Sequence, residues 1–388
     1  MPSLPWRVSV RSAARQHDFA LVRRVARSLR DLARDRSLDG RGRGTPERSK
    51  ALSDRASART RPFEPIGDRR FRILSLDGGG IKGTFTASVL ATIEEMSDKN
   101  VAEHFDLIVG ASTGGIIALA LGLGLPAHRI RDLYVKNGPQ IFGATGVRGS
   151  FRRFFRAKHD SRRLREALNG EFGARRLGES TTRLVIPSFN VVSGAVHLFK
   201  TSHHPRFKRD YLWKVKDVAM ATSAAPTYFS IFHHEESGLR LVDGGVWANN
   251  PVAVGVNEAI GVLGCARDGI EVLSIGTTGA PFHVKPKKRH GGLLGWGRGS
   301  IRLLMEAQTQ GMAGLAHAIT QHDRRLLRID PTVAPGRFSL DDPKQISELG
   351  AVGEEAAKHA ERRVHEHFLD EPAPTFEPYR VLSAETRS

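Results

Sequence analysis

Short apolar runs alternate with longer segments of helical spacing from residue 71 onward. The short runs predict strands at 71–76, 105–110, 183–192, 195–200, 239–243 and 270–275. The longer segments predict helices at 84–97, 113–123, 126–142, 252–263, 300–322 and 343–369. Strands that alternate with helices in this way predict an α/β protein, a three-layer α/β/α sandwich around a mainly parallel central sheet.

The two ends of the chain differ from this regular middle part. Residues 1–69 are rich in Arg, Ser, Ala and Asp and poor in aromatic residues, which predicts a basic, disordered N-terminal segment. We expect residues 70–280 to form the main α/β domain, and residues 281–388 to form a basic loop and a helical region packed on it. Within the main domain, residues 143–180 are rich in Arg and Gly and are only weakly patterned.

Positive charge is unevenly distributed along the chain. The net charge is +18, and residues 1–70 carry 18 Lys and Arg against 8 Asp and Glu. A basic segment can contact nucleic acid or an anionic membrane, but its composition favours a solvated tail, so we expect no nucleic-acid polymer as a partner. A second basic stretch, 285–299, surrounds Trp296 with Lys and Arg. This stretch suits peripheral contact with a membrane surface and suits an ordinary solvated loop equally well.

The single cysteine and the apolar run lengths limit the class of protein further. Cys265 alone excludes an internal disulfide and a cysteine-based zinc site. The longest apolar stretch, 116–127, is shorter than the roughly 20 residues that span a bilayer. No continuous apolar region resembling a signal peptide follows the arginine-rich start. These features predict a cytoplasmic protein.

The first glycine-rich motif, DGGGIKG at 77–83, follows a predicted strand and precedes a predicted helix. It fits the dinucleotide fingerprint G-x-G-x-x-G, but the next strand ends at Gly110 without the acidic residue that would hold a ribose. A phosphate-binding P-loop is also disfavoured, because Lys82 precedes the last glycine of the motif. We expect the backbone amides of this loop to stabilise an oxyanion. The candidate residues are Gly78, Gly79, Gly80, Ile81, Lys82 and Gly83.

The second motif, GASTG at 110–114, places Ser112 in a G-x-S-x-G frame between a strand and a helix. That frame is typical of a sharp turn that exposes a nucleophilic hydroxyl, with Gly110 and Gly114 flanking the turn. The alternative is a tight strand–helix connection in which the serine only caps the helix.

The third motif, DGG at 243–245, places Asp243 at the end of a strand, followed by Gly244 and Gly245. If this strand is parallel to the one before Ser112, the two side chains lie along the same edge of the sheet. None of the 16 histidines stands in a distinctive late turn, so Asp243 is the candidate base. A carboxylate is a weak base, with an ordinary pKa near 3.9, so such a pair favours esters over amides. The alternative is an Asp-Gly pair that only forms a turn.

Together these motifs resemble those of the patatin-like phospholipase family, as does ATSAAPTYF at 221–229. The resemblance covers about 71–280 and implies a catalytic domain at 70–280. It implies Ser112 as nucleophile, Asp243 as base and the amides of Gly79 and Gly80 as oxyanion donors. It also implies hydrolysis of acyl esters in phospholipids or related lipids without a metal or a cofactor. Lys82 stands where many members carry arginine.

The C-terminal region, with LLRIDP at 326–331 and LDD at 340–342, is similar to bacterial members that serve in antiviral defence. Those members are switched on by a cyclic dinucleotide, and the arginines at 148–156 and 162–165 could bind its phosphates. Two other classes stay open: a lipid-binding module that keeps the fold without catalysis, and a dinucleotide-binding enzyme.

Overall fold

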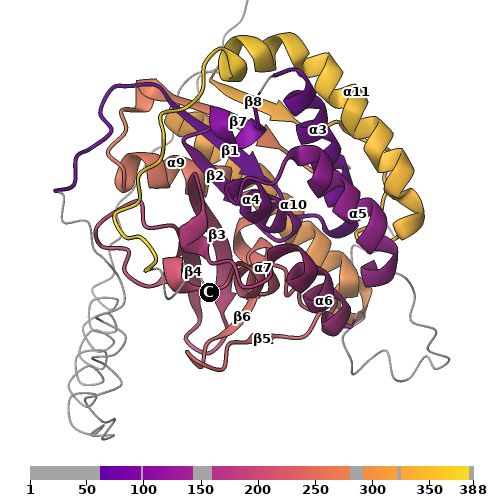
Figure 1. Ribbon diagram of the computed structural model, residues 1–388. Helices are drawn as coiled ribbons and strands as arrows, with labels where there is room; N and C mark the ends of the chain where they lie inside the picture. The colour runs from indigo at the N-terminus through magenta and orange to yellow at the C-terminus, as the bar shows by residue number, and fades with distance from the viewer. Residues whose placement is uncertain (1–61, 98, 143–159, 280–291, 321–324, 384–388) are drawn as a thin grey trace, which may run out of the picture. The chain divides into compact units, whose positions relative to one another are not determined.

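The computed structural model describes residues 62–97, 99–142, 160–279, 292–320 and 325–383 (Figure 1). These residues belong to one compact unit, Arg55–Ser388, which is built around an eight-stranded sheet. The strands are β1 (Phe71–Leu76), β2 (Leu107–Gly110), β3 (Arg183–Asn190), β4 (Ala195–Lys200), β5 (Phe232–His233), β6 (Arg240–Asp243), β7 (Ile270–Ile275) and β8 (Leu326–Ile329).

The sheet has a parallel centre and an antiparallel end. Five strands run parallel in the order β3-β2-β1-β7-β8. The remaining three are antiparallel additions, in which β4 and β6 pair with β3 and β5 pairs with β6. The prediction of a mainly parallel sheet is therefore confirmed.

Helices cover both faces of the sheet (Figure 1). One face carries α3 (Gly83–Glu95), α4 (Thr113–Gly122), α5 (Ala127–Phe142), α6 (Ser161–Phe172), α7 (Val215–Thr222) and α11 (Ile346–Val364). The other face carries α8 (Gly245–Ala248), α9 (Val252–Gly261) and α10 (Gly292–Thr320). Short helical turns lie at Gly80–Lys82, Val101–His104, Leu177–Glu179, Asp210–Leu212, Arg267–Gly269, Pro343–Gln345 and His365–Leu369.

The two faces bury two separate hydrophobic cores. Along β1, Ile73 points into the core beneath α9, while Leu74 and Leu76 belong to the core beneath α3 and α4. Every residue of β1 is buried, as expected for a central parallel strand with helices on both faces. Helix α11 packs along the outer side of α3, so that α3 lies between the sheet and a further helix (Figure 1).

Several elements differ from the sequence prediction. The weakly patterned segment 143–180 contains α6, in which Leu164, Leu168 and Phe172 recur every four residues and are buried. Asp160 caps this helix by accepting a hydrogen bond from the amide of Arg162. The apolar side chains occupy only one narrow face of the helix, and charged residues fill the positions between them. The segment therefore shows only a weak apolar pattern in the sequence.

Two further differences concern the C-terminal third. The loop predicted at 285–299 is partly wrong, since α10 already begins at Gly292, whereas residues 285–291 lie outside the described part of the chain. Strand β8 was not predicted either, because it is only four residues long and contains Arg328. Its Leu327 and Ile329 are buried against the α3 side of the sheet, so the C-terminal region contributes a strand as well as helices.

Candidate functional site

Ser112 occupies a strained turn between β2 and α4. Its φ is 54°, in the left-handed region that non-glycine residues rarely adopt. The flanking glycines make this turn sterically feasible. A Cβ on Gly110 would lie 2.2 Å from the carbonyl oxygen of Gly114, and one on Gly114 would lie 2.3 Å from that of Leu76. This sharp strand-to-helix turn, the elbow, is of the kind that exposes a hydroxyl in α/β hydrolases.

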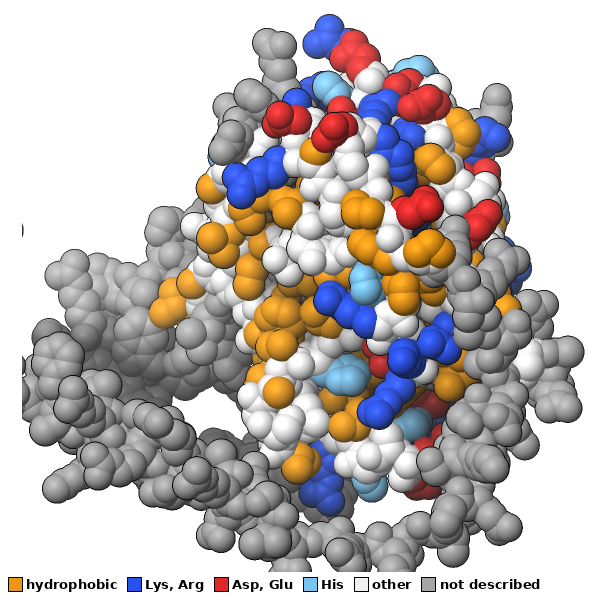
Figure 2. Space-filling view, turned by 90° about the vertical axis from the view of Figure 1, so that its left-hand side faces the viewer, with side chains coloured by type: hydrophobic (Ala, Val, Ile, Leu, Met, Phe, Trp, Pro, Cys, Tyr) orange, Lys and Arg blue, Asp and Glu red, His pale blue; other side chains and the backbone are white. Residues whose placement is uncertain are grey.

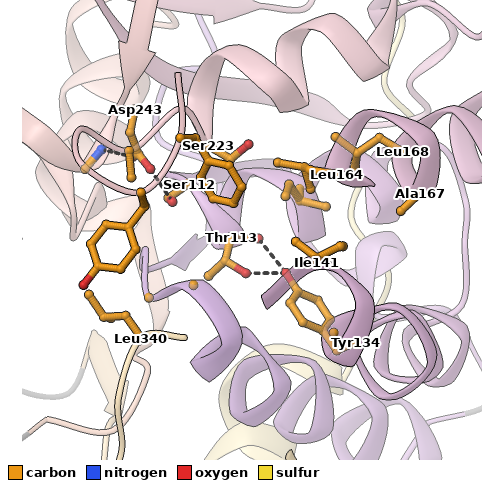
Figure 3. Close-up of a pocket in the computed structure, with 18 of the residues that line it drawn as sticks. Ser112, Thr113, Tyr134, Ile141, Leu164, Ala167, Leu168, Ser223, Asp243 and Leu340 are labelled. Carbon is orange, nitrogen blue, oxygen red and sulfur yellow. Dashed lines mark hydrogen bonds between the residues drawn. The ribbon is translucent and has the colours of Figure 1, made fainter. Parts of the chain in front are cut away.

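The structure brings Ser112 and Asp243 together, although by a different route from the one predicted. Strand β3 is parallel to β2 and antiparallel to β6. The carboxyl ends of β2 and β6 therefore point toward each other. Strand β3 pairs with β2 through Arg183–Val185 and with the end of β6 at Ser188. The expectation of two parallel strands is wrong. The side chains nevertheless meet, and Ser112 Oγ donates a 2.6 Å hydrogen bond to Asp243 Oδ2 (Figure 3).

Asp243 lies in an environment that favours its neutral form. The residue is 3% exposed, and its Oδ1 accepts a 2.6 Å hydrogen bond from the amide of Gly245. Burial raises the pKa of Asp243 to about 7, although the hydrogen bonds from Ser112 and Gly245 act in the opposite direction. Within the described part of the chain, no histidine donates to this carboxylate. Such a carboxylate is a much stronger base near neutral pH than an ordinary aspartate.

The loop after β1 passes beside the elbow. Gly80 has φ +57°, and a Cβ there would lie 2.3 Å from the carbonyl oxygen of Leu340. The amide of Gly78 donates to Asn249 O, and that of Ile81 donates to Leu340 O, both at 2.9 Å. Among the described residues, the amides of Gly79 and Gly80 donate no such bond. The amides of Gly78 and Ile81 therefore hold the loop in place.

Three other residues predicted for the site, Gly83, Lys82 and Gly244, contact neighbouring segments of the chain. A Cβ on Gly83 would lie 2.2 Å from Thr113 Oγ1, so the loop closely approaches the elbow here. Lys82 Nζ donates to the carbonyl oxygen of Thr278 at 3.0 Å. A Cβ on Gly244 would lie 2.2 Å from Pro187 O, where β6 turns against β3.

Thr222, in the ATSAAPTYF segment, supports the elbow directly. Its hydroxyl accepts a 3.1 Å hydrogen bond from the Ser112 amide and donates a 2.7 Å bond to Pro187 O. The sequence pointed to this segment but did not reveal the role of Thr222. The hydrogen bond ties the strained backbone of Ser112 to β3.

A largely apolar cavity of about 310 Å³ opens beside Ser112 and Asp243 (Figure 3). Helices α4, α5 and α6 form its inner wall with Ile116, Ala120, Ile130, Leu133, Ile141, Leu164, Ala167, Leu168 and Phe172. Tyr134 reaches the elbow from α5, where its hydroxyl hydrogen-bonds to the hydroxyl and carbonyl of Thr113. Ala120 is eight residues beyond Ser112 on α4, so the cavity extends about 12 Å from the hydroxyl along this helix.

The described residues contain no cluster of three His, Cys, Asp or Glu side chains that could hold a metal ion. No helix among them is both long and apolar enough to cross a membrane.

An α/β sandwich with a hydroxyl–carboxylate pair beside an apolar cavity is an arrangement that suits a lipid hydrolase. The sequence pattern of the patatin-like phospholipase family matches residues 74–256. A "cGAMP-activated phospholipase" of Pseudomonas aeruginosa is 32% identical over 81% of this chain and 93% of its own length. Proteins of the same name from Vibrio cholerae and Escherichia coli are each 33% identical over 79% of this chain and over 96% and 95% of their own lengths. The chain belongs to the patatin-like phospholipase family.

Proposed function

We propose that this protein is a serine acyl hydrolase of the phospholipase A type, which releases fatty acids from phospholipids or related lipid esters. The observation that carries the proposal is the 2.6 Å hydrogen bond from Ser112 Oγ to Asp243 Oδ2 beside the apolar cavity. Family membership supports lipid hydrolysis, and the geometry supports the assignment of roles.

The proposed reaction passes through an acyl-enzyme. Asp243 takes the proton of Ser112 while Oγ attacks the ester carbonyl carbon, and the carbonyl oxygen becomes an oxyanion. The amides of Gly79 and Gly80 donate to this oxyanion. As the tetrahedral intermediate collapses, the ester bond breaks and Asp243 returns its proton to the leaving alkoxide. Asp243 then takes a proton from water, whose hydroxide attacks the acyl-enzyme, and the proton returns to Ser112 Oγ as the fatty acid leaves.

The apolar cavity supports a long acyl chain as the group transferred. Its wall of α4, α5 and α6 side chains buries hydrocarbon, and each methylene buried contributes about 0.8 kcal/mol to binding. A polar headgroup finds few partners in such a cavity, so we place the headgroup outside it.

We further propose that the protein contacts membranes peripherally. The face in Figure 2 carries patches of hydrophobic side chains with Lys, Arg and His among them. The structure exposes several large apolar side chains, including Val192 at 69% and Ile231 at 55%. Co-sedimentation with anionic and with neutral vesicles tests this contact. Absence of the protein from both vesicle pellets would contradict it.

Activation by a cyclic dinucleotide is proposed from the relatives' names and from α6. This helix carries Arg162, Arg163 and Arg165 beside Leu164 and Leu168, which line the cavity. A phosphate bound by these arginines could therefore act on the cavity wall. The arginines of 148–156 lie outside the described residues. We expect one member of a panel of cyclic dinucleotides to raise lipase activity sharply, and a panel without binding or stimulation would refute this activation.

The dyad is tested by fatty-acid release from phospholipid vesicles. Ser112→Ala and Asp243→Ala should each lose nearly all activity, and the double variant should be no worse, because paired catalytic groups act as a unit. Substantial release by Asp243→Ala would assign the base to another residue. Unchanged release by Ser112→Ala would assign the nucleophile to another residue, and wild-type release no higher than background would leave a lipid-binding module as the better description of this site.

A further inference from the structure

The loop Asp77–Gly83 needs support from outside itself. Its two proposed donors, the amides of Gly79 and Gly80, make no hydrogen bond among the described residues, and Gly80 sits at φ +57°. An oxyanion site works only if its donors already lie in place when charge develops. The residues that hold this loop therefore bear directly on the rate of the reaction.

Arg328 provides a rigid support for the start of this loop. Its Nη1 and Nη2 donate to Oδ1 and Oδ2 of Asp77 at 3.0 and 2.6 Å, a bidentate pair. Nη1 also donates to Ser274 Oγ at 2.7 Å, and Nη2 donates to Asp330 Oδ2 at 2.8 Å. The Asp77 side chain is 3% exposed and that of Arg328 is 23% exposed, so solvent screens this pair only weakly.

The sheet itself brings these residues to one place. Ser75 of β1 pairs with Ser274 of β7, which pairs with Arg328 of β8, so the three lie in one row across the strands. Asp77 follows Ser75 by two residues, immediately beyond the end of β1. The guanidinium thus reaches across β7 to the residue with which the loop begins. Arg328 also lies outside the 74–256 match to the family pattern.

A second set of contacts ties the same support to the far side of the loop. Asp330 Oδ1 accepts a 2.9 Å hydrogen bond from the amide of Gly279, and Lys82 Nζ donates to the neighbouring Thr278 carbonyl. Arg328 lies between Asp77 and Asp330 and bonds to both. Burial raises the pKa of Asp77 to about 6, and the charge of Arg328 works against that rise. Without the guanidinium, Asp77 would be neutral over a wider pH range and would hold the loop less firmly.

We propose that Arg328 is a positioning residue for hydrolysis: through Asp77 it fixes the loop so that the Gly79 and Gly80 amides meet the oxyanion. This inference rests on the proposed function. Arg328 itself contacts neither Ser112 nor Asp243 by any hydrogen bond among the described residues.

The test is Arg328→Lys, which keeps the positive charge but loses the bidentate geometry. With a soluble short-chain ester, we expect kcat to fall about 10- to 100-fold while KM stays nearly unchanged, because only the transition state carries the oxyanion. The matched control is Arg325→Lys, whose side chain pairs with the exposed Asp268 instead. The control should keep the wild-type kcat.

A double-mutant cycle with Asp77→Asn separates positioning from a general loss of structure. If Arg328 acts through Asp77, the double variant should lose little more kcat than Asp77→Asn alone. If Arg328→Lys does not fold, Ser274→Ala replaces it as the test variant. Ser274→Ala removes one hydrogen bond made by Arg328, so it should also lower kcat, but by a smaller factor.

Three results would overturn the inference. A folded Arg328→Lys protein with the wild-type kcat would do so, as would a loss confined to KM or fully additive effects in the cycle. Wild type and Ser112→Ala are measured in parallel. Equal activity of these two would refute the proposed function, whereas failure of the positioning role alone would affect only the Arg328 comparisons.

Discussion

Asp243→Asn is expected to make the protein inactive and, at alkaline pH, more stable. The folded-state pKa of Asp243 is about 7 and its ordinary value is 3.8. Because the folded value is raised, this carboxyl destabilises the folded state increasingly as pH rises from about 4 to about 7. Linkage gives a cost of about 2 kcal/mol at pH 5 and about 4 kcal/mol at pH 8. An asparagine has no such cost, and its Oδ1 can still accept from the amide of Gly245.

The measurement compares melting temperatures of both proteins at pH 5 and pH 8. Unfolding entropy of about 2.1 cal/mol/K per residue, over roughly 330 residues, corresponds to about 1.5 °C per kcal/mol. The melting temperature of Asp243→Asn relative to wild type should therefore rise by about 3 °C between the two pH values. The other titrating groups are the same in both proteins, so their effects cancel in the difference between the two melting temperatures at each pH. The wild-type rate should also increase with pH through about 7, as the base loses its proton.

Equal differences in melting temperature at both pH values would refute this reasoning, since they would mean that Asp243 is already ionised at pH 5. A wild-type rate that levels off near pH 4 would refute it independently.

Two further predictions concern the loop and a buried cluster. Gly80→Ala should abolish hydrolysis, because its Cβ would lie 2.3 Å from the Leu340 carbonyl oxygen. The control is Gly124→Ala, which is also at positive φ but has open space around the added Cβ. The control should lower the free energy of unfolding by only about 1–2 kcal/mol and keep the wild-type rate. Equal activity of the two variants would contradict the role of the loop. Burial raises the pKa of Glu258, but the hydrogen bond from His203 and nearby positive charge outweigh burial and hold this pKa below its usual value. Glu258→Gln should therefore lose about 3 kcal/mol at pH 7 in urea unfolding, a loss that shrinks as pH falls below about 4.3; a loss under 0.5 kcal/mol would contradict this.

The parts of the fold that could be predicted from the sequence are those with a local signal. The buried strands β1 and β7 were predicted with their observed bounds, because continuous apolar runs between turns are visible directly. The Ser112 elbow was visible because each flanking glycine meets a steric demand within a few residues.

Features that depend on distant partners could not be predicted. The antiparallel direction of β6 is set by its pairing with β3, more than 50 residues earlier, and no local pattern encodes it. From the sequence alone, Arg328 is an arginine in a short apolar segment, with no sign of a partner. Its partner Asp77 is 251 residues away in the sequence, and only the pairing of the strands brings the two together. Thr222 likewise gains its role only when α7 ends beside the elbow.

The most direct test of the central claim is covalent labelling with a fluorophosphonate serine probe, followed by intact-mass and peptide mass spectrometry. We predict one label per chain, on Ser112, with no label on Ser112→Ala and much slower labelling of Asp243→Ala. Labelling of another serine, or undiminished labelling of Asp243→Ala, would contradict the account of a Ser112–Asp243 dyad.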